Sequence, residues 1–230
     1  MGQLFPGAII FLGPPGSGKG TQADTFADSR DGYYHFDTGR ELNVIFEDPK
    51  NRDNAAIQMR HEQLRRGELV DPDWVTSVVC EGIRRVANSG KGVIFSGSPR
   101  TLQEARAVVP LLMDVYGRDS LVVVKLNVNP ETSIHRNTSR RVCVRCARPL
   151  LSTTETRDMA FCPVCGGELA VRKDDTEEIM KNRLDQYRRR TEPIYEYYQT
   201  MGIPIFDIDG ERSPEEIHLD ISDTIDKYSR

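Results

Sequence analysis

One glycine-rich stretch constrains the fold of this chain more than any other feature: it reads Gly13-Pro14-Pro15-Gly16-Ser17-Gly18-Lys19-Gly20-Thr21. It has the spacing of a glycine, four residues, then glycine and lysine, and it lies between an apolar run at residues 8–12 and a helical pattern at 21–28. The glycines let successive backbone N–H groups turn towards one anion, and the following helix aims its positive end at the same point. The stretch therefore predicts a phosphate-binding loop between a strand and a helix.

Two side chains of this loop indicate how ATP would bind. Lys19 would bridge the β- and γ-phosphates, and a hydroxyl near the helix start would meet the accompanying Mg²⁺. The hydroxyl ordinarily follows the lysine directly, whereas here Gly20 follows it and Thr21 supplies the hydroxyl. We expect ATP with Mg²⁺ to bind along residues 13–21.

The rest of the chain alternates between short apolar runs and longer helical patterns. Strands are predicted at 8–12, 33–36, 93–96, 121–126 and 203–208, and helices at 21–28, 72–88, 101–116 and 176–201. Without hairpin signals, this alternation predicts an α/β fold of the P-loop type, a three-layer sandwich with a five-stranded parallel sheet flanked by helices. Right-handed crossovers place the loops after the strands on one edge, where such sheets bind ligands.

Four of the five cysteines form two C-x-x-C pairs, namely Cys143 with Cys146 and Cys162 with Cys165, separated by 15 residues. Two tight turns that each present two thiolates predict a tetrahedral site for structural Zn²⁺. A redox-active thiol pair would need only one of the two pairs. The metal would supply folding energy that a polar segment cannot obtain from a hydrophobic core. Cys80 is left over, and we expect it to be a small buried hydrophobe on a helix.

Charge is unevenly distributed along the chain. The net charge is −4, but residues 136–173 contain eight basic and three acidic residues, so this segment carries +5 and the remainder −9. The excess indicates a local anionic ligand or a solvated basic face, and the acidic total argues against nucleic acid as a partner. No apolar run approaches the roughly 20 residues of a membrane-spanning helix, and no secretion signal begins the chain. We expect a cytoplasmic monomer with no membrane partner.

The order of these motifs resembles the adenylate kinase family in its long form, which has a zinc-bearing lid. The glycine after the loop lysine is one shared feature. Family motifs of the acceptor site resemble Thr38-Gly39, Gly67-Glu68-Leu69-Val70 and Gly97-Ser98-Pro99-Arg100. Those of the lid and the segment after it resemble Arg136, Arg140-Arg141, Arg172-Lys173-Asp174-Asp175 and Arg183, followed by Tyr187 and Thr191-Glu192-Pro193.

The resemblance implies reversible transfer of the γ-phosphoryl group of ATP to AMP, which gives two ADP. It implies that the cations acting on the transferred group are Lys19, Arg100, Arg136, Arg140, Arg172 and Arg183, and that Arg136 and Arg140 also bind ATP. Arginine suits this role because its planar guanidinium makes paired bonds to phosphate. The acceptor would be bound by Thr38, Gly39, Arg40, Asn43, Glu68, Leu69, Val70, Gly97, Arg100, Gln103, Glu104, Arg172 and Arg183.

The resemblance also implies a division of the chain. A core would comprise residues 1–37, 71–135 and 174–230. A helical insertion for the acceptor nucleotide would occupy 38–70, and a zinc-ribbon-like lid 136–173. Asp174 and Asp175 could pair with lid arginines when the lid closes, or could form a solvated helix start.

The acceptor side departs from the family pattern. Asn43 stands where the family has the arginine that holds the phosphate of AMP, and Arg40, three residues earlier, could supply the missing charge. Ser96 replaces an aspartate expected to orient a Mg²⁺-bound water, and Ser98 replaces a phenylalanine.

Glu104 falls where the family has a glutamine that reads adenine, and Gln103 lies one residue earlier. An ionised carboxylate can only accept hydrogen bonds, which suits the N1–H and amino group of guanine better than adenine. Alternatively Gln103 could reach the base, or Glu104 could simply face solvent. The main expectation is transfer to AMP, with Arg40 and Gln103 compensating. The alternatives are a kinase for another monophosphate, GMP first, and an ATP-binding regulatory protein with weak catalysis.

Overall fold

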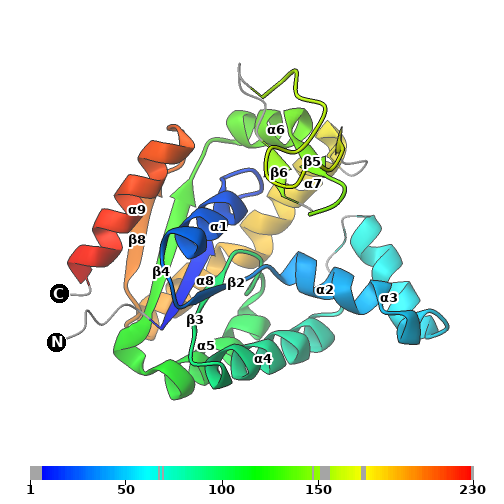
Figure 1. The fold of residues 1–230 in the computed structure, drawn as a ribbon. Coiled ribbons are helices and arrows are strands. Elements are labelled where there is room, and N and C mark those ends of the chain that lie inside the picture. The colour runs from blue at the N-terminus through cyan, green and yellow to red at the C-terminus, as the bar shows by residue number, and fades with distance from the viewer. Residues whose placement is uncertain are drawn as a thin grey trace.

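The central sheet of the computed structural model has five parallel strands in the order β2-β3-β1-β4-β8 (Figure 1). Its strands are β1 (Ala8–Leu12), β2 (Tyr33–Phe36), β3 (Gly92–Phe95), β4 (Leu121–Asn127) and β8 (Ile205–Asp209). The structure describes residues 7–66, 68, 70–146, 148–150, 156–171 and 175–228. The sheet confirms the fold class predicted from the alternation of patterns.

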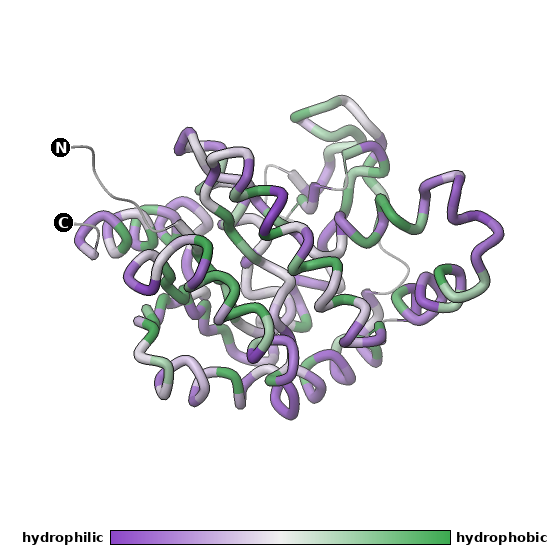
Figure 2. Tube along the Cα trace, turned by 90° about the horizontal axis from the view of Figure 1, so that it is seen from below, coloured by the Kyte–Doolittle hydropathy of each residue, from purple (hydrophilic) through white to green (hydrophobic). Residues whose placement is uncertain are grey.

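Helices cover both faces of this sheet. One face packs against α4 (Pro72–Asn88), α5 (Leu102–Tyr116) and α8 (Pro193–Thr200). The other packs against α1 (Lys19–Ser29) and α9 (Pro214–Tyr228). Strand β1 sends alternate side chains into the two clusters, Ile10 into one and Ile9 into the other, because successive residues of a strand face opposite sides. Hydrophobic and hydrophilic residues accordingly alternate along the bordering helices (Figure 2).

The segment between β2 and α4 forms a helical excursion beyond the sheet edge (Figure 1). It consists of α2 (Thr38–Glu47), the 3₁₀ turn η1 (Pro49–Asn51) and α3 (Ala55–Arg65). Asp37 and Asn54 cap the two α-helices with their side chains. A small cluster of its own, with Leu42, Phe46 and Ile57 buried, holds the excursion together. These elements lie within the helical insertion that the resemblance implies at 38–70.

The cysteine-bearing segment contains a second, antiparallel sheet in the order β6-β5-β7. Its strands are β5 (Arg141–Cys143), β6 (Pro149–Leu150) and β7 (Leu169–Val171). Helix α6 (Pro130–Ser139) leads into it and α7 (Glu177–Gln186) follows it. Residue 136, the proposed first residue of the lid, therefore lies inside α6.

The structure adds detail that the sequence patterns did not show. The helix expected at 176–201 is three elements, because the π-helical turn η3 (Tyr187–Thr191) separates α7 from α8, and Pro193 begins α8. Helices α6 and α9 and the short 3₁₀ turn η2 (Arg118–Ser120) were not predicted. Across the described part of the chain, none of the helices has the length and apolar character needed to span a membrane.

Candidate active site

The phosphate loop connects β1 to α1 at the carboxyl edge of the sheet, as the sequence predicts. Gly13, Gly16 and Gly18 have positive φ angles of 151°, 76° and 92°. At Gly16 the space is also closed, since a Cβ there would lie 2.4 Å from Nδ2 of Asn137 and 2.7 Å from the carbonyl oxygen of Ser133. Only glycine satisfies both the backbone angle and the close approach of α6.

A hydrogen bond ties the loop to α6, since the hydroxyl of Ser133 donates to the carbonyl oxygen of Pro15 at 2.5 Å. Within α6, Nδ2 of Asn137 donates to the carbonyl oxygen of Ser133 at 2.7 Å. The same helix carries Arg136, and Arg140 follows its last residue. The phosphate loop and two of the predicted phosphate-binding arginines are thereby held on neighbouring rigid elements.

Lys19 opens α1 and turns back over the loop. Its Nζ donates to the carbonyl oxygens of Gly13 and Pro14, both at 2.7 Å. Burial of the ammonium group, and after it the positive charges of Arg100 and Arg140, together lower the pKa of Lys19 to about 7. Three of the predicted cations, Lys19, Arg100 and Arg140, therefore lie close enough for their charges to interact, as a site for a polyanion requires.

The buried carboxylate of Asp175 contacts Arg140 and a further predicted arginine, Arg183. Asp175 accepts from Arg140 at 2.7 and 3.0 Å, and Arg183 lies 3.5 Å from the same carboxylate. Asp175 thus pairs with one arginine of the lid segment, Arg140, and a solvated position is wrong for this residue. Arg136 instead donates to the carbonyl oxygens of Gly210 and Glu211, after β8.

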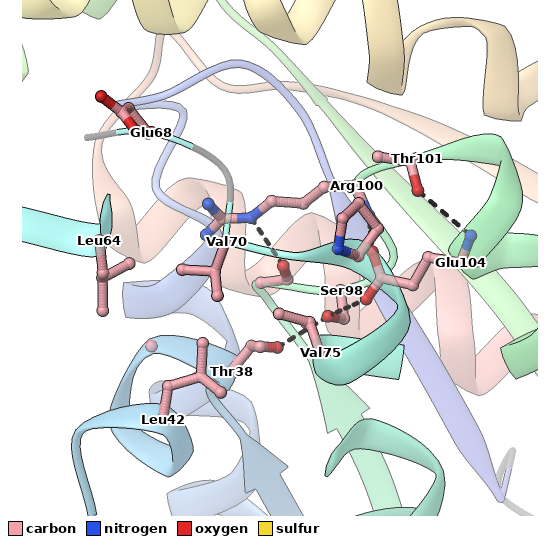
Figure 3. A pocket seen from close by; sticks show the side chains of 13 residues that line it. Thr38, Leu42, Leu64, Glu68, Val70, Val75, Ser98, Arg100, Thr101 and Glu104 are labelled. Atoms are coloured by element: carbon pink, nitrogen blue, oxygen red, sulfur yellow. Dashed lines mark hydrogen bonds between the residues drawn. The ribbon is translucent and has the colours of Figure 1, made fainter. Parts of the chain in front are cut away.

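An open pocket lies between the sheet edge and the helical excursion (Figure 3). Of the residues predicted to bind the acceptor, those that line it are Thr38, Gly39, Glu68, Val70, Gly97, Arg100 and Glu104. Sequence reasoning did not assign its other walls, which are Leu42, Leu64, Pro72, Val75, Ser98 and Thr101. The four on α2–α4 are apolar or proline residues, which carry no signal beyond helix amphipathicity. Two predicted residues, Leu69 and Arg172, lie outside the described residues, as do Gly67, Lys173 and Asp174.

A chain of hydrogen bonds runs along the floor of the pocket (Figure 3). Thr38 Oγ1 donates to Ser98 Oγ at 2.9 Å, and Ser98 Oγ donates to Glu104 Oε1 at 2.5 Å. The backbone N–H of Arg100 donates to the other oxygen of Glu104 at 2.7 Å. Burial raises the pKa of Glu104 despite these bonds, since the residue is only 4% exposed. The alternative in which Glu104 simply faces solvent is wrong.

Besides Arg183, three other predicted acceptor residues lie away from the pocket lining. Arg40 donates to both carboxylate oxygens of Asp24, at 2.7 and 2.9 Å. Gln103 is exposed and donates to Asp73 at 2.5 Å, and Asn43 is exposed on α2. The roles given to these three residues at the acceptor stay predictions.

Sequence reasoning missed His35, which stands at the end of β2. Its Nδ1 lies 2.7 Å from Oδ1 of Asp24, and its Nε2 lies 2.7 Å from Oγ of Ser96. The signal that could have found it is positional. His35 and Ser96 lie at the carboxyl ends of two strands predicted to be parallel, and such ends meet at one sheet edge.

The four cysteines of the lid come together as predicted. Their sulfur atoms all lie within 4.8 Å of one another, with Cys143 and Cys162 buried and the other two half-buried. Cys80, by contrast, is half-buried on α4 and packs against the core.

Comparison with known proteins gives a consistent result. A sequence model described as adenylate kinase matches residues 11–203. The adenylate kinase of Carboxydothermus hydrogenoformans is 34% identical over 220 residues, which cover 95% of this chain and 99% of that protein. The adenylate kinases of Syntrophomonas wolfei and Methanocella arvoryzae are each 32% identical, over 95% and 96% of this chain and 98% and 99% of their own lengths.

Proposed function

Since the chain belongs to the adenylate kinase family, we propose that it transfers the γ-phosphoryl group of ATP reversibly to AMP and forms two ADP. The position of Arg100 carries the proposal. This residue lines the acceptor pocket, and its charge also lowers the pKa of Lys19 in the phosphate loop. A donor phosphate on the loop and an acceptor phosphate in the pocket would therefore meet beside the same guanidinium.

The arrangement would act mainly by positioning and by charge. A phosphoryl group in transfer spreads negative charge over its oxygens, and preorganised cations stabilise that charge without rearranging. Such cations are supplied by Lys19, Arg100 and Arg140, and Asp175 holds the guanidinium group of Arg140 in one orientation. Closure of the lid over ATP would exclude water, which limits hydrolysis.

Mg²⁺ fits the phosphate loop by the chemistry of its donors. The hydroxyl of Thr21, in the first turn of α1, and the phosphates of ATP are the hard oxygen ligands that Mg²⁺ prefers. Bound there, Mg²⁺ would neutralise charge on the transferred group.

Zn²⁺ fits the four cysteines as a structural ion. Sulfur atoms about 2.3 Å from a tetrahedral zinc lie about 3.8 Å apart. Here the Sγ atoms of Cys143 and Cys165 are 3.4 Å apart, and those of Cys146 and Cys162 are 3.9 Å apart. The ion would hold together the small lid sheet, whose strands are two or three residues long.

A coupled assay of ADP formation from ATP with AMP, GMP, CMP or UMP tests the proposed reaction. We expect AMP to give the highest kcat/KM, and a Lys19→Ala variant that keeps its fold to lose activity with every acceptor. A folded wild-type protein that turns over none of the four would contradict the proposal.

The same assay examines a second candidate, a kinase for GMP. The observation that favours it is the buried carboxylate of Glu104 on the pocket floor. A carboxylate has lone pairs beyond those already used by Ser98 and Arg100, and guanine offers N–H donors to them. A higher kcat/KM with GMP than with AMP would decide for this candidate.

A further inference from the structure

Asp24, His35 and Ser96 form a continuous hydrogen-bonded relay beside the phosphate loop. Asp24 comes from α1, His35 from β2, and Ser96 follows the last residue of β3. The imidazole lies 2.7 Å from the carboxylate on one side and 2.7 Å from the hydroxyl on the other. The side chains of His35 and Asp24 are 5% and 12% exposed, so the relay is shielded from water.

The charge on Asp24 bears on which atoms of the relay donate hydrogen bonds and which accept them. Burial by itself would raise the pKa of Asp24, but hydrogen bonds from His35 and Arg40 outweigh burial and hold the pKa below its usual value. An ionised Asp24 can only accept, so a neutral His35 that donates to it has its proton on Nδ1 and leaves Nε2 as an acceptor. The hydroxyl of Ser96 then donates to Nε2. This is the order of groups that activates a serine hydroxyl as a nucleophile.

Ser96, which carries the hydroxyl of this relay, follows β3 directly and precedes Gly97 of the acceptor pocket. Strand β3 pairs with β1 so that Phe95 stands opposite Ile10, and Ser96 continues β3 towards the level at which β1 enters the phosphate loop. The next residue, Gly97, lines the acceptor pocket, and its carbonyl oxygen accepts from Nε of Arg100 at 2.7 Å. Asp24 lies in α1, five residues beyond Lys19.

Transfer to a nucleoside monophosphate does not require this relay. The acceptor oxygen of a phosphate monoester is already ionised at neutral pH, so it needs no base. A hydroxyl acceptor does need one, because its proton must leave as the oxygen attacks. The relay therefore fits a hydroxyl as acceptor, and the hydroxyl it holds is that of Ser96.

We propose that Ser96 is itself a phosphoryl acceptor, so that the protein phosphorylates its own Ser96 from bound ATP when no monophosphate occupies the pocket. The bond from Oγ to the γ-phosphorus forms as the bond from that phosphorus to the β,γ-bridging oxygen breaks. ADP leaves with the electron pair, and the hydroxyl proton passes to Nε2 of His35. Asp24 stabilises the resulting imidazolium. This inference rests on the proposed binding of ATP at the phosphate loop.

Incubation of the dephosphorylated protein with γ-labelled ATP and Mg²⁺, without a monophosphate, tests the proposal. We expect one acid-stable phosphate per chain, mapped to Ser96 by mass spectrometry, at a rate independent of protein concentration. Ser96→Ala should lose the label, and His35→Gln should slow labelling about 100-fold or more. Ser29→Ala, at an exposed serine of α1, is the matched control and should label as the wild type does.

The same preparations are assayed for ADP formation from ATP and AMP. Turnover of AMP without any label on Ser96 overturns the inference and leaves the proposed function intact. Label on Ser96 without turnover of AMP supports the inference and contradicts the proposed function. Absence of both overturns both, and a phosphate mapped to another residue overturns the inference. Should His35→Gln fail to fold, the site mapped in the wild-type protein still decides.

Discussion

Asp175 and Arg140 form a paired ion contact in which Oδ2 accepts from Nε at 2.7 Å and Oδ1 accepts from Nη2 at 3.0 Å. The carboxylate is fully buried, whereas the arginine side chain is 19% exposed. Arg183, on α7, lies 3.5 Å from the same carboxylate. One negative charge thus joins the end of α6, which touches the phosphate loop, to the helix that follows the lid.

Replacing Asp175 by asparagine should destabilise the protein. The substitution keeps the shape of the side chain but removes the buried negative charge that Arg140 and Arg183 face, at a cost of about 3 kcal/mol. Urea unfolding measures the loss. Asp158→Asn is the control, because Asp158 pairs with Arg157 on the exposed surface and should change the free energy of unfolding by less than about 1 kcal/mol. Equal stability losses in the two variants would contradict the structural role of Asp175.

ATP binding should take up a proton at mildly alkaline pH. With its pKa lowered to about 7, Lys19 is largely neutral at pH 8, and the phosphates of ATP would raise that pKa and charge it. The uptake should shrink as the pH falls below about 6, where Lys19 is already protonated. Calorimetry in buffers of different ionisation enthalpy measures it. Lys19→Met should abolish the uptake, while Lys50→Met, at an exposed position in η1, should preserve it.

Glu104 should influence which base the acceptor carries. In Glu104→Gln the side chain keeps its length but gains an N–H donor, which can meet a ring nitrogen of adenine and no longer suits the N–H edge of guanine. We expect the ratio of kcat/KM for AMP over GMP to rise about tenfold or more, equivalent to about 1.4 kcal/mol. An unchanged ratio would show that Glu104 does not contact the base. Glu81→Gln, on the exposed face of α4, provides the matched control.

The same substitution should alter the pH dependence of stability. Because burial raises the pKa of Glu104 in the folded protein, the folded state favours the protonated form. Its contribution to stability is present below the ordinary glutamate pKa and is lost as the pH rises through the raised value. Glu104→Gln should therefore raise Tm relative to wild type more at pH 8 than at pH 4.5. A Tm difference that does not depend on pH would contradict this reading.

Much of the fold could be predicted because its signals are local. The strands are short apolar runs, and the phosphate loop is read from glycine spacing beside one of them. Helix α6 was missed because its contacts with the loop are polar, through Ser133 and Asn137, and leave no hydrophobic periodicity. Helix α9 had a signal that was overlooked. Ser213 and Glu216 form a capping box in which each side chain accepts from the backbone N–H of the other.

The candidate site was harder to predict where residues meet through tertiary contacts. The cysteine cluster followed from spacing, since each pair lies on one turn. The position of Arg40 could not follow from the sequence, because its partner Asp24 lies on another helix. Thr101 caps the start of α5 at the pocket, and on the first turn of this helix Glu104 is buried whereas Gln103 faces solvent.

The zinc site should depend on a glycine as well as on the cysteines. A Cβ on Gly167 would lie 2.8 Å from Sγ of Cys143 and 2.7 Å from Cβ of Arg145, so alanine there would push the two cysteine turns apart. We expect one zinc per chain by elemental analysis in the wild type, and weaker retention against a chelator in Gly167→Ala. Cys143→Ser should lose the ion and lower Tm, because metal binding contributes folding free energy. Cys80→Ser, on α4 away from the cluster, should keep a full zinc content. Wild-type protein that lacks zinc and whose Tm does not respond to added zinc or chelator would refute a structural site.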